Sequence, residues 1–123
     1  MAFSEDRVKE RSRLWLRSEG WKTKISWGKK RGIDVLAISG NRKWIIEAKG
    51  EGSRTQMRLN YFVALLGEIL QRMDDPNAKY SVALPYLDRY KKLWDCLPSN
   101  AKSRLRITFL LVPKRGRIVE LQP

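Results

Sequence analysis

The residues best suited to chemistry lie in one short segment, IDVLAISGNRKWIIEAK, at positions 33–49. Two apolar runs rich in β-formers flank Gly40-Asn41, a pair typical of a two-residue hairpin turn. Pairing outward from this turn sets Asp34 opposite Glu47. Directly opposed residues share one face of a hairpin, with Cβ atoms about 5 Å apart. Lys49 follows two residues after Glu47, so we expect it to emerge on that same face.

This patch would hold two carboxylates and an ammonium at the open end of an apolar hairpin. Opposed like charges are destabilising, and their burial costs more. A divalent cation would compensate, because hard oxygen ligands suit Mg²⁺ or Mn²⁺, and magnesium takes one or two carboxylates together with waters and substrate phosphates. The alternative is a salt-bridge cluster in which Lys49 neutralises one of the acids.

The segment GIDVLAI...WIIEAKG resembles the core of the PD-(D/E)XK nuclease superfamily, in which Gly-x-Asp is followed on the next strand by Glu-x-Lys. Gly32 before Asp34 and Gly50 after Lys49 also match. The resemblance implies a restriction-endonuclease-like α/β fold with an αβββαβ core, a mixed central sheet and flanking helices. It implies a metal-dependent DNA endonuclease, either structure-selective like Holliday-junction resolvases or weakly sequence-specific. A non-catalytic DNA-binding module that keeps the fold is the alternative.

The same resemblance implies roles for individual residues. Asp34, Glu47 and the backbone carbonyl of Ala48 would hold Mg²⁺, for which Mn²⁺ could substitute. Lys49 would orient the attacking water or stabilise charge in the transition state.

Two further positions are candidates for the catalytic site. Glu10 is the first choice for an acid on the first helix, because ERSRLWLRSEGW resembles the corresponding helix of resolvase-like members, and Glu5 is the alternative. Gln56 could approach the site from the helix after the motif. Its other interpretation is a capping box formed with Ser53.

The charge balance points to a polyanionic partner. Lysine and arginine total 26 against 13 acids, a net charge of +13, which favours DNA and, second, an anionic membrane surface. Lys29, Lys30 and Arg31 precede the strand of Asp34 and could contact phosphates beside the cleaved bond. A solvated charge run is the alternative, and the turn at 114–117 is a second basic candidate.

Composition excludes several classes of protein. The chain has no histidine, which removes Ser-His-Asp triads, imidazole zinc sites and nucleases with a histidine base. Cys96 is the one cysteine, expected as a small core residue, so no intrachain disulfide forms and a reducing cytoplasm is indicated. The longest apolar run, 61–66, is too short to span a membrane.

The hairpin needs elements around it to position its charged residues. We expect a helix over 4–19 capped by Ser4, then a strand over 22–27 before the hairpin. A helix over 53–73 should follow, with an apolar face of Leu59, Phe62, Val63, Leu66, Leu70 and Met73. Strands over 79–84, 105–112 and 118–121 and a helix over 86–97 complete one domain, 1–123, around a single sheet. Cutting both DNA strands at a fixed offset would require two active sites, which a homodimer would supply.

Overall fold

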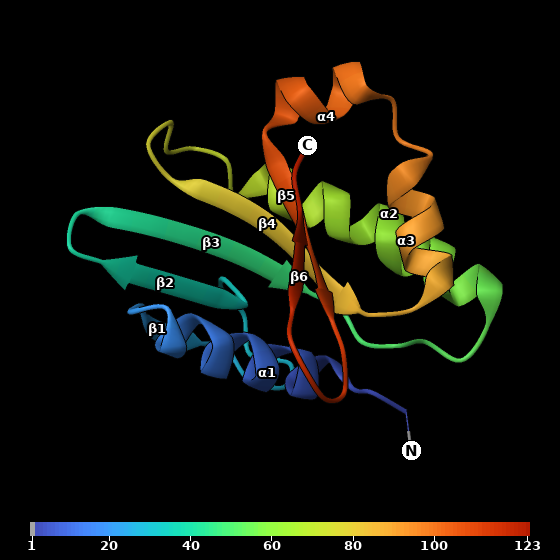
Figure 1. Ribbon diagram of the computed structural model, residues 1–123, viewed down its shortest axis with the longest axis horizontal. Helices are drawn as coiled ribbons and strands as arrows, with labels where there is room; N and C mark the ends of the chain where they lie inside the picture. The colour runs from blue at the N-terminus through green and yellow to red at the C-terminus, as the bar shows by residue number, and fades with distance from the viewer. Residues whose placement is uncertain (1) are drawn as a thin grey trace.

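The strands of the central sheet lie side by side in chain order (Figure 1). The computed structural model describes residues 2–123. The first three strands pair antiparallel, the third to fifth pair parallel, and the last pair is antiparallel. Their bounds are β1 (Lys22–Ile25), β2 (Val35–Ser39), β3 (Arg42–Ala48), β4 (Lys79–Pro85), β5 (Ile107–Val112) and β6 (Val119–Leu121). This mixed sheet confirms the predicted α/β fold class.

Helices cover the two faces of the sheet unequally. The helix α1 (Glu5–Ser18) buries Val8 and Leu16 against one face, while α2 (Thr55–Gln71) and α3 (Asp88–Asp95) form the other core. A short helix α4 (Ser99–Leu105) follows α3 and was not predicted. The segment Ser99–Leu105 has only two apolar residues, Ala101 and Leu105, and none of its residues is buried, so the sequence offers too little apolar periodicity to reveal a helix.

The first helix and the hairpin form as predicted. The Ser4 side chain accepts a hydrogen bond from the Arg7 backbone N–H (3.2 Å) and caps α1. In the hairpin, Ser39 pairs with Arg42 and Val35 pairs with Ile46, which is the register expected for a turn at Gly40-Asn41. Gly40 has a φ of 62°, as the first residue of this turn requires.

The helix α2 departs from prediction at its start and in its buried face. It begins at Thr55, and the N-cap residue Arg54 makes no side-chain cap, so the expected capping box of Ser53 and Gln56 is wrong. Its buried residues are Phe62, Leu65 and Ile69. Two residues predicted to be buried, Val63 and Leu70, are 59% and 46% exposed. The helix is apolar around much of its circumference, so periodicity alone could not choose the stripe that meets the sheet.

Two further expectations concerned the burial of Cys96 and the absence of a membrane-spanning segment. Cys96, expected in the core, is exposed on the surface beyond α3. Among residues 2–123, none of the helices combines the length and apolar character that a membrane crossing requires.

Candidate active site

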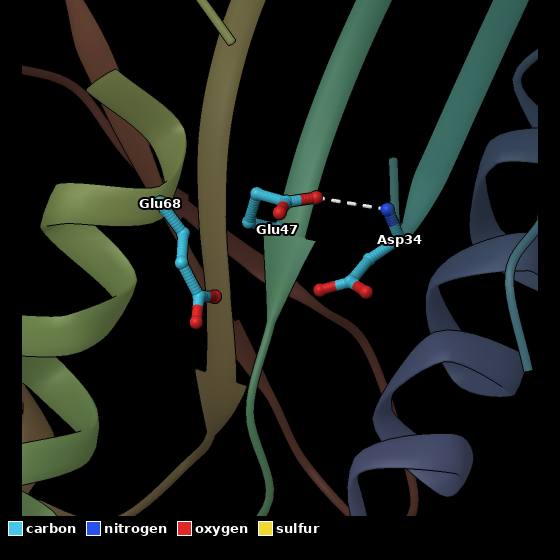
Figure 2. Close-up of side chains that lie close together, drawn as sticks. All are labelled: Asp34, Glu47 and Glu68. Atoms are coloured by element: carbon cyan, nitrogen blue, oxygen red, sulfur yellow. Dashed lines mark hydrogen bonds between the residues drawn. The ribbon is translucent and has the colours of Figure 1, made fainter. Parts of the chain in front are cut away.

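Asp34 and Glu47 face each other at the open end of the β2–β3 hairpin, as the register predicts (Figure 2). The Asp34 backbone N–H donates a hydrogen bond to Glu47 Oε2 (2.8 Å). The backbone N–H of Ala48 donates in turn to Asp34 Oδ2 (2.8 Å). Each strand thus fixes the carboxylate of the other, and the two acids lie close together at the edge of a buried core.

A third carboxylate, from Glu68 on α2, completes the group (Figure 2). One oxygen from each of Asp34, Glu47 and Glu68 lies within 4.8 Å of the others. The packing of Leu65 and Ile69 against the sheet positions α2 so that Glu68 reaches Glu47. Sequence reasoning missed Glu68. The available signal was a single acidic residue inside the apolar run YFVALLGEIL.

Each of the three carboxylates has a cation beside it. Lys9 Nζ lies 3.4 Å from Asp34 Oδ1, Arg72 Nε lies 3.5 Å from Glu47 Oε1, and Lys49 Nζ lies 3.1 Å from Glu68 Oε1. Lys49 therefore emerges beside the acids as expected, and it pairs with the unpredicted Glu68 rather than with Asp34 or Glu47. Lys9 and Arg72 were not singled out, because nothing in their local sequence separates them from the other basic residues.

The buried carboxyl of Glu47 is electrostatically unfavourable as an anion. Its side chain is 3% exposed. Burial raises its pKa to about 7, and the negative charges of Asp34 and Glu68 act in the same direction. The hydrogen bond from the Asp34 N–H and the charge of Arg72 oppose this shift without cancelling it. A divalent cation, which carries more charge than the Arg72 guanidinium, would stabilise the ionised form of Glu47.

Lys49 remains a strong cation in this setting. Burial lowers its pKa, but the hydrogen bond and charge of Glu68, with the charges of Glu5 and Asp34, outweigh burial and leave the pKa raised. The side chain is 24% exposed. An ammonium group is thus held charged beside the carboxylates and within reach of solvent.

Lys9 links α1 to the hairpin from inside the protein. Its side chain is 1% exposed, and its Nζ donates to the Ser26 carbonyl (2.6 Å) and pairs with Glu5 (2.9 Å) as well as Asp34. Burial lowers the pKa of Lys9, while Glu5 and Asp34 raise it by more, so the net shift is upward. This lysine fixes the position of Asp34 relative to the first helix.

The structure does not bring Glu10 to the cluster, which corrects the first choice for the helical acid. Glu10 forms an ion pair with Arg13 (2.6 Å), and its side chain is 41% exposed. Glu5, the alternative, lines the same hollow as Asp34 and Glu47. Five residues along a helix rotate a side chain by about 140° beyond a full turn, so Glu5 and Glu10 cannot serve one site.

Gln56 also lies away from the carboxylates. Its side-chain amide donates to Asn60 Oδ1 (3.2 Å), and the residue is exposed. It precedes Glu68 by twelve residues, about 18 Å along a helix axis. The end of α2 that reaches the cluster is thus the opposite end from the one predicted.

A basic loop forms one wall of the site. Lys29, Lys30 and Arg31 line a hollow of about 450 Å³ together with the three carboxylates, Lys49 and Arg72. The loop is held at both ends, because the Gly28 N–H donates to Asp6 Oδ1 (3.0 Å) and Arg72 Nη2 donates to the Gly32 carbonyl (2.9 Å). The other basic turn, 114–117, is attached to α1 through hydrogen bonds from Arg11 to the carbonyls of Pro113 and Gly116.

Comparison with known proteins defines the fold. No protein-family model matches the chain, and no curated protein does. A solved structure of an fdxN element excision controlling factor protein from Anabaena variabilis aligns over 86% of this chain and 89% of that one, with 21% identity and a TM-score of 0.50. An XisH family protein from Nostoc punctiforme aligns over 85% and 88%, with 20% identity and a TM-score of 0.49.

At this level of identity, the first likeness bears on the fold alone. Together with the strand order, it defines the protein as a mixed α/β domain with a restriction-endonuclease-like fold. Asp34 and Glu47 lie at the open end of the central hairpin, where the Asp34 N–H donates to the Glu47 carboxylate and the Ala48 N–H donates to the Asp34 carboxylate.

Proposed function

We propose that this protein is a metal-dependent DNA endonuclease. The observation that carries the proposal is the grouping of Asp34, Glu47 and Glu68 within 4.8 Å, with Lys49 beside them and a basic loop on the wall of the same hollow. Hydrolysis of a phosphodiester needs a cation for the phosphate, a polar group for water and positive charge for the flanking backbone. This hollow contains residues suited to each of these tasks.

The donor set fits a hard divalent cation. Three carboxylates converge, and oxygen ligands of this kind suit Mg²⁺ or Mn²⁺. Asp34 and Glu47 are the proposed ligands, together with the backbone carbonyl of Ala48, and Glu68 is an additional candidate that the motif did not supply. The bound cation would supply Lewis-acid activation of the phosphate and of water.

The chain's own residues would position the reactants. Lys49 would orient the attacking water or stabilise the charge that develops on the phosphate oxygens. Its pairing with Glu68 holds the ammonium in place beside the proposed metal ligands. Lys29, Lys30 and Arg31 would hold the phosphates next to the cleaved bond, which fixes the position of the DNA without reading its sequence.

The test is direct cleavage. The protein would be incubated with duplex, single-stranded, flap and four-way-junction DNA, each with Mg²⁺, Mn²⁺ or EDTA. Cleavage of one form with metal, lost with EDTA and in Asp34→Asn, supports the proposal. Glu10→Gln is a matched control, because it also neutralises one acid but lies outside the hollow. If the wild type cuts none of these forms with either metal, a non-catalytic DNA-binding module is the better description.

A further inference from the structure

One strip of the sheet next to the carboxylates is not covered by a helix. Cross-strand neighbours share a face, so the register defines rows of residues running from β1 to β3. The row at the site holds Ser26, Asp34 and Glu47, because the Ser26 N–H donates to the Asp34 carbonyl (3.1 Å) and the two acids are already paired. The next rows are Lys24, Leu36 and Ile45, and then Lys22, Ile38 and Lys43.

This face is open over β1 and β2. The helix α2 packs against β3 and β4. Figure 1 shows α2 and α3 towards the β4–β5 end of the sheet, away from the edge formed by β1. Ile38 is accordingly 39% exposed, and Leu36 is half-buried, whereas Ile45 is 3% exposed. On the opposite face of β2, Val35 and Ala37 are buried in the core that includes residues of α1.

Exposed lysines border this open strip and lead to the active site. Lys22 and Lys24 are both exposed and project from the same face of β1. A second hollow of about 210 Å³ is lined by Lys24, Leu36, Lys30 and Arg31, and it adjoins the first because Lys30 and Arg31 line both. Lys43, which borders the strip on the β3 side, is instead paired with Asp75 (3.3 Å).

We propose that the open strip of β1 and β2 is a platform for nucleic acid, over which the DNA backbone runs away from the carboxylate cluster and contacts Lys24 and then Lys22. The identity of the ligand rests on the proposed function. Successive rows are about 7 Å apart along the strand, a spacing that neighbouring phosphates of one strand can match. The apolar floor of Leu36 and Ile38 offers contact to sugars without competing charge.

If this strip is the platform, the DNA backbone runs from the carboxylate cluster along β1, past Lys24 to Lys22. Lysines on an edge strand also prevent pairing with a second sheet edge. That role would explain their exposure, but it requires no dependence of DNA binding on either lysine. The two explanations therefore differ in a measurable way.

The experiment measures binding of a fluorescent DNA duplex at several salt concentrations, in EDTA so that no metal-dependent cleavage occurs. Lys22→Ala combined with Lys24→Ala should make the log–log salt slope shallower by about 1 to 2 units, since each phosphate contact contributes about 0.9. The matched control is Lys92→Ala combined with Arg104→Ala. It removes the same charge from exposed positions on α3 and α4, near the opposite edge of the sheet, and should keep the wild-type slope.

The outcomes separate this inference from the proposed function. An unchanged slope in the lysine pair, with a reduced slope after substitution of 29–31, overturns the platform and leaves the nuclease proposal standing. A reduced slope in a protein that cleaves no DNA supports the platform and overturns the nuclease. A wild type that binds no DNA at low salt overturns both. If the alanine pair melts far below the wild type, Lys22→Gln with Lys24→Gln is measured instead, because glutamine keeps part of the side-chain stem.

Discussion

Glu47→Gln should stabilise the metal-free protein above neutral pH, although it removes a proposed metal ligand. The pKa of Glu47 is raised from 4.5 to about 7, so the folded protein binds this proton more tightly than the unfolded chain does. Stability from the protonated form is present at low pH and is lost as the pH rises from about 4.5 to 7. The difference of about 2.5 pKa units corresponds to about 3 kcal/mol at 1.36 kcal/mol per unit.

Glutamine should avoid this cost while keeping the main contact. Its side-chain carbonyl can accept the hydrogen bond that Asp34 N–H now donates to Glu47 Oε2. Its amide gains nothing from Arg72, so we expect a net stabilisation of about 2 kcal/mol above pH 8, shrinking towards zero at pH 5.

The assay is urea denaturation in EDTA from pH 5 to pH 8.5, comparing wild type, Glu47→Gln and Glu10→Gln. The last variant makes the same change in net charge at an ion pair on the surface, where the neighbouring Arg13 lowers the pKa of Glu10. Adding Mn²⁺ should make the wild type more stable than Glu47→Gln, because an ion stabilises only a folded protein that binds it. A Glu47→Gln protein that is less stable than wild type in EDTA at pH 8 would refute the argument that the buried anion is under-compensated.

Other predictions concern the site and its neighbours. Mg²⁺ or Mn²⁺ should raise the melting temperature of wild type but not of Asp34→Asn, and equal shifts would rule out the site as drawn. Lys49→Ala should abolish cleavage while leaving the Kd for DNA nearly unchanged, since other cations dominate phosphate binding; parallel loss of both would contradict its assigned role. Alanine at 29–31 should make the salt slope of DNA binding shallower by about 1 to 3 units, equally across sequences. Lys9→Met should lower the free energy of unfolding in urea by about 3 kcal/mol, because the nearby carboxylates lose their buried cationic partner. Mn²⁺ should then stabilise this variant more than the wild type, since the ion replaces the lost positive charge, and an equal response to Mn²⁺ in the two proteins would refute this explanation.

The predictable part of the site is the part made by local pairing. A two-residue turn fixes which residues oppose each other, so the sequence sufficed to place Asp34 against Glu47 and Lys49 beside them. Lys9 and Glu68 reach the same place only through the docking of α1 and α2. The face by which each helix packs on the sheet could not be read from its apolar residues. The helix α1 buries a lysine, and α2 has more apolar surface than the sheet covers.

The choice of Glu10 over Glu5 failed for the same reason. The pattern of residues around a helical acid shows that a helix is present, but not which of its faces meets the hairpin. Lys9 is buried on the face of α1 that meets the hairpin, where it pairs with Glu5 and Asp34, and this buried charge is not visible in the apolar spacing of the helix. The buried residues of a helix can be inferred from apolar spacing only when apolar residues make the contact.

The sequential strand order has a consequence for how the protein assembles. Every strand pairs with its neighbour in the chain, so the sheet can grow one strand at a time. The β2–β3 hairpin closes over two residues, and hairpins form within about 1 to 10 μs. Asp34 and Glu47 should therefore meet early, and the repulsion between them is present before Lys9 docks beside Asp34 and Arg72 docks beside Glu47. Ionic conditions that screen or bind these two acids should accelerate folding, as well as stabilising its product.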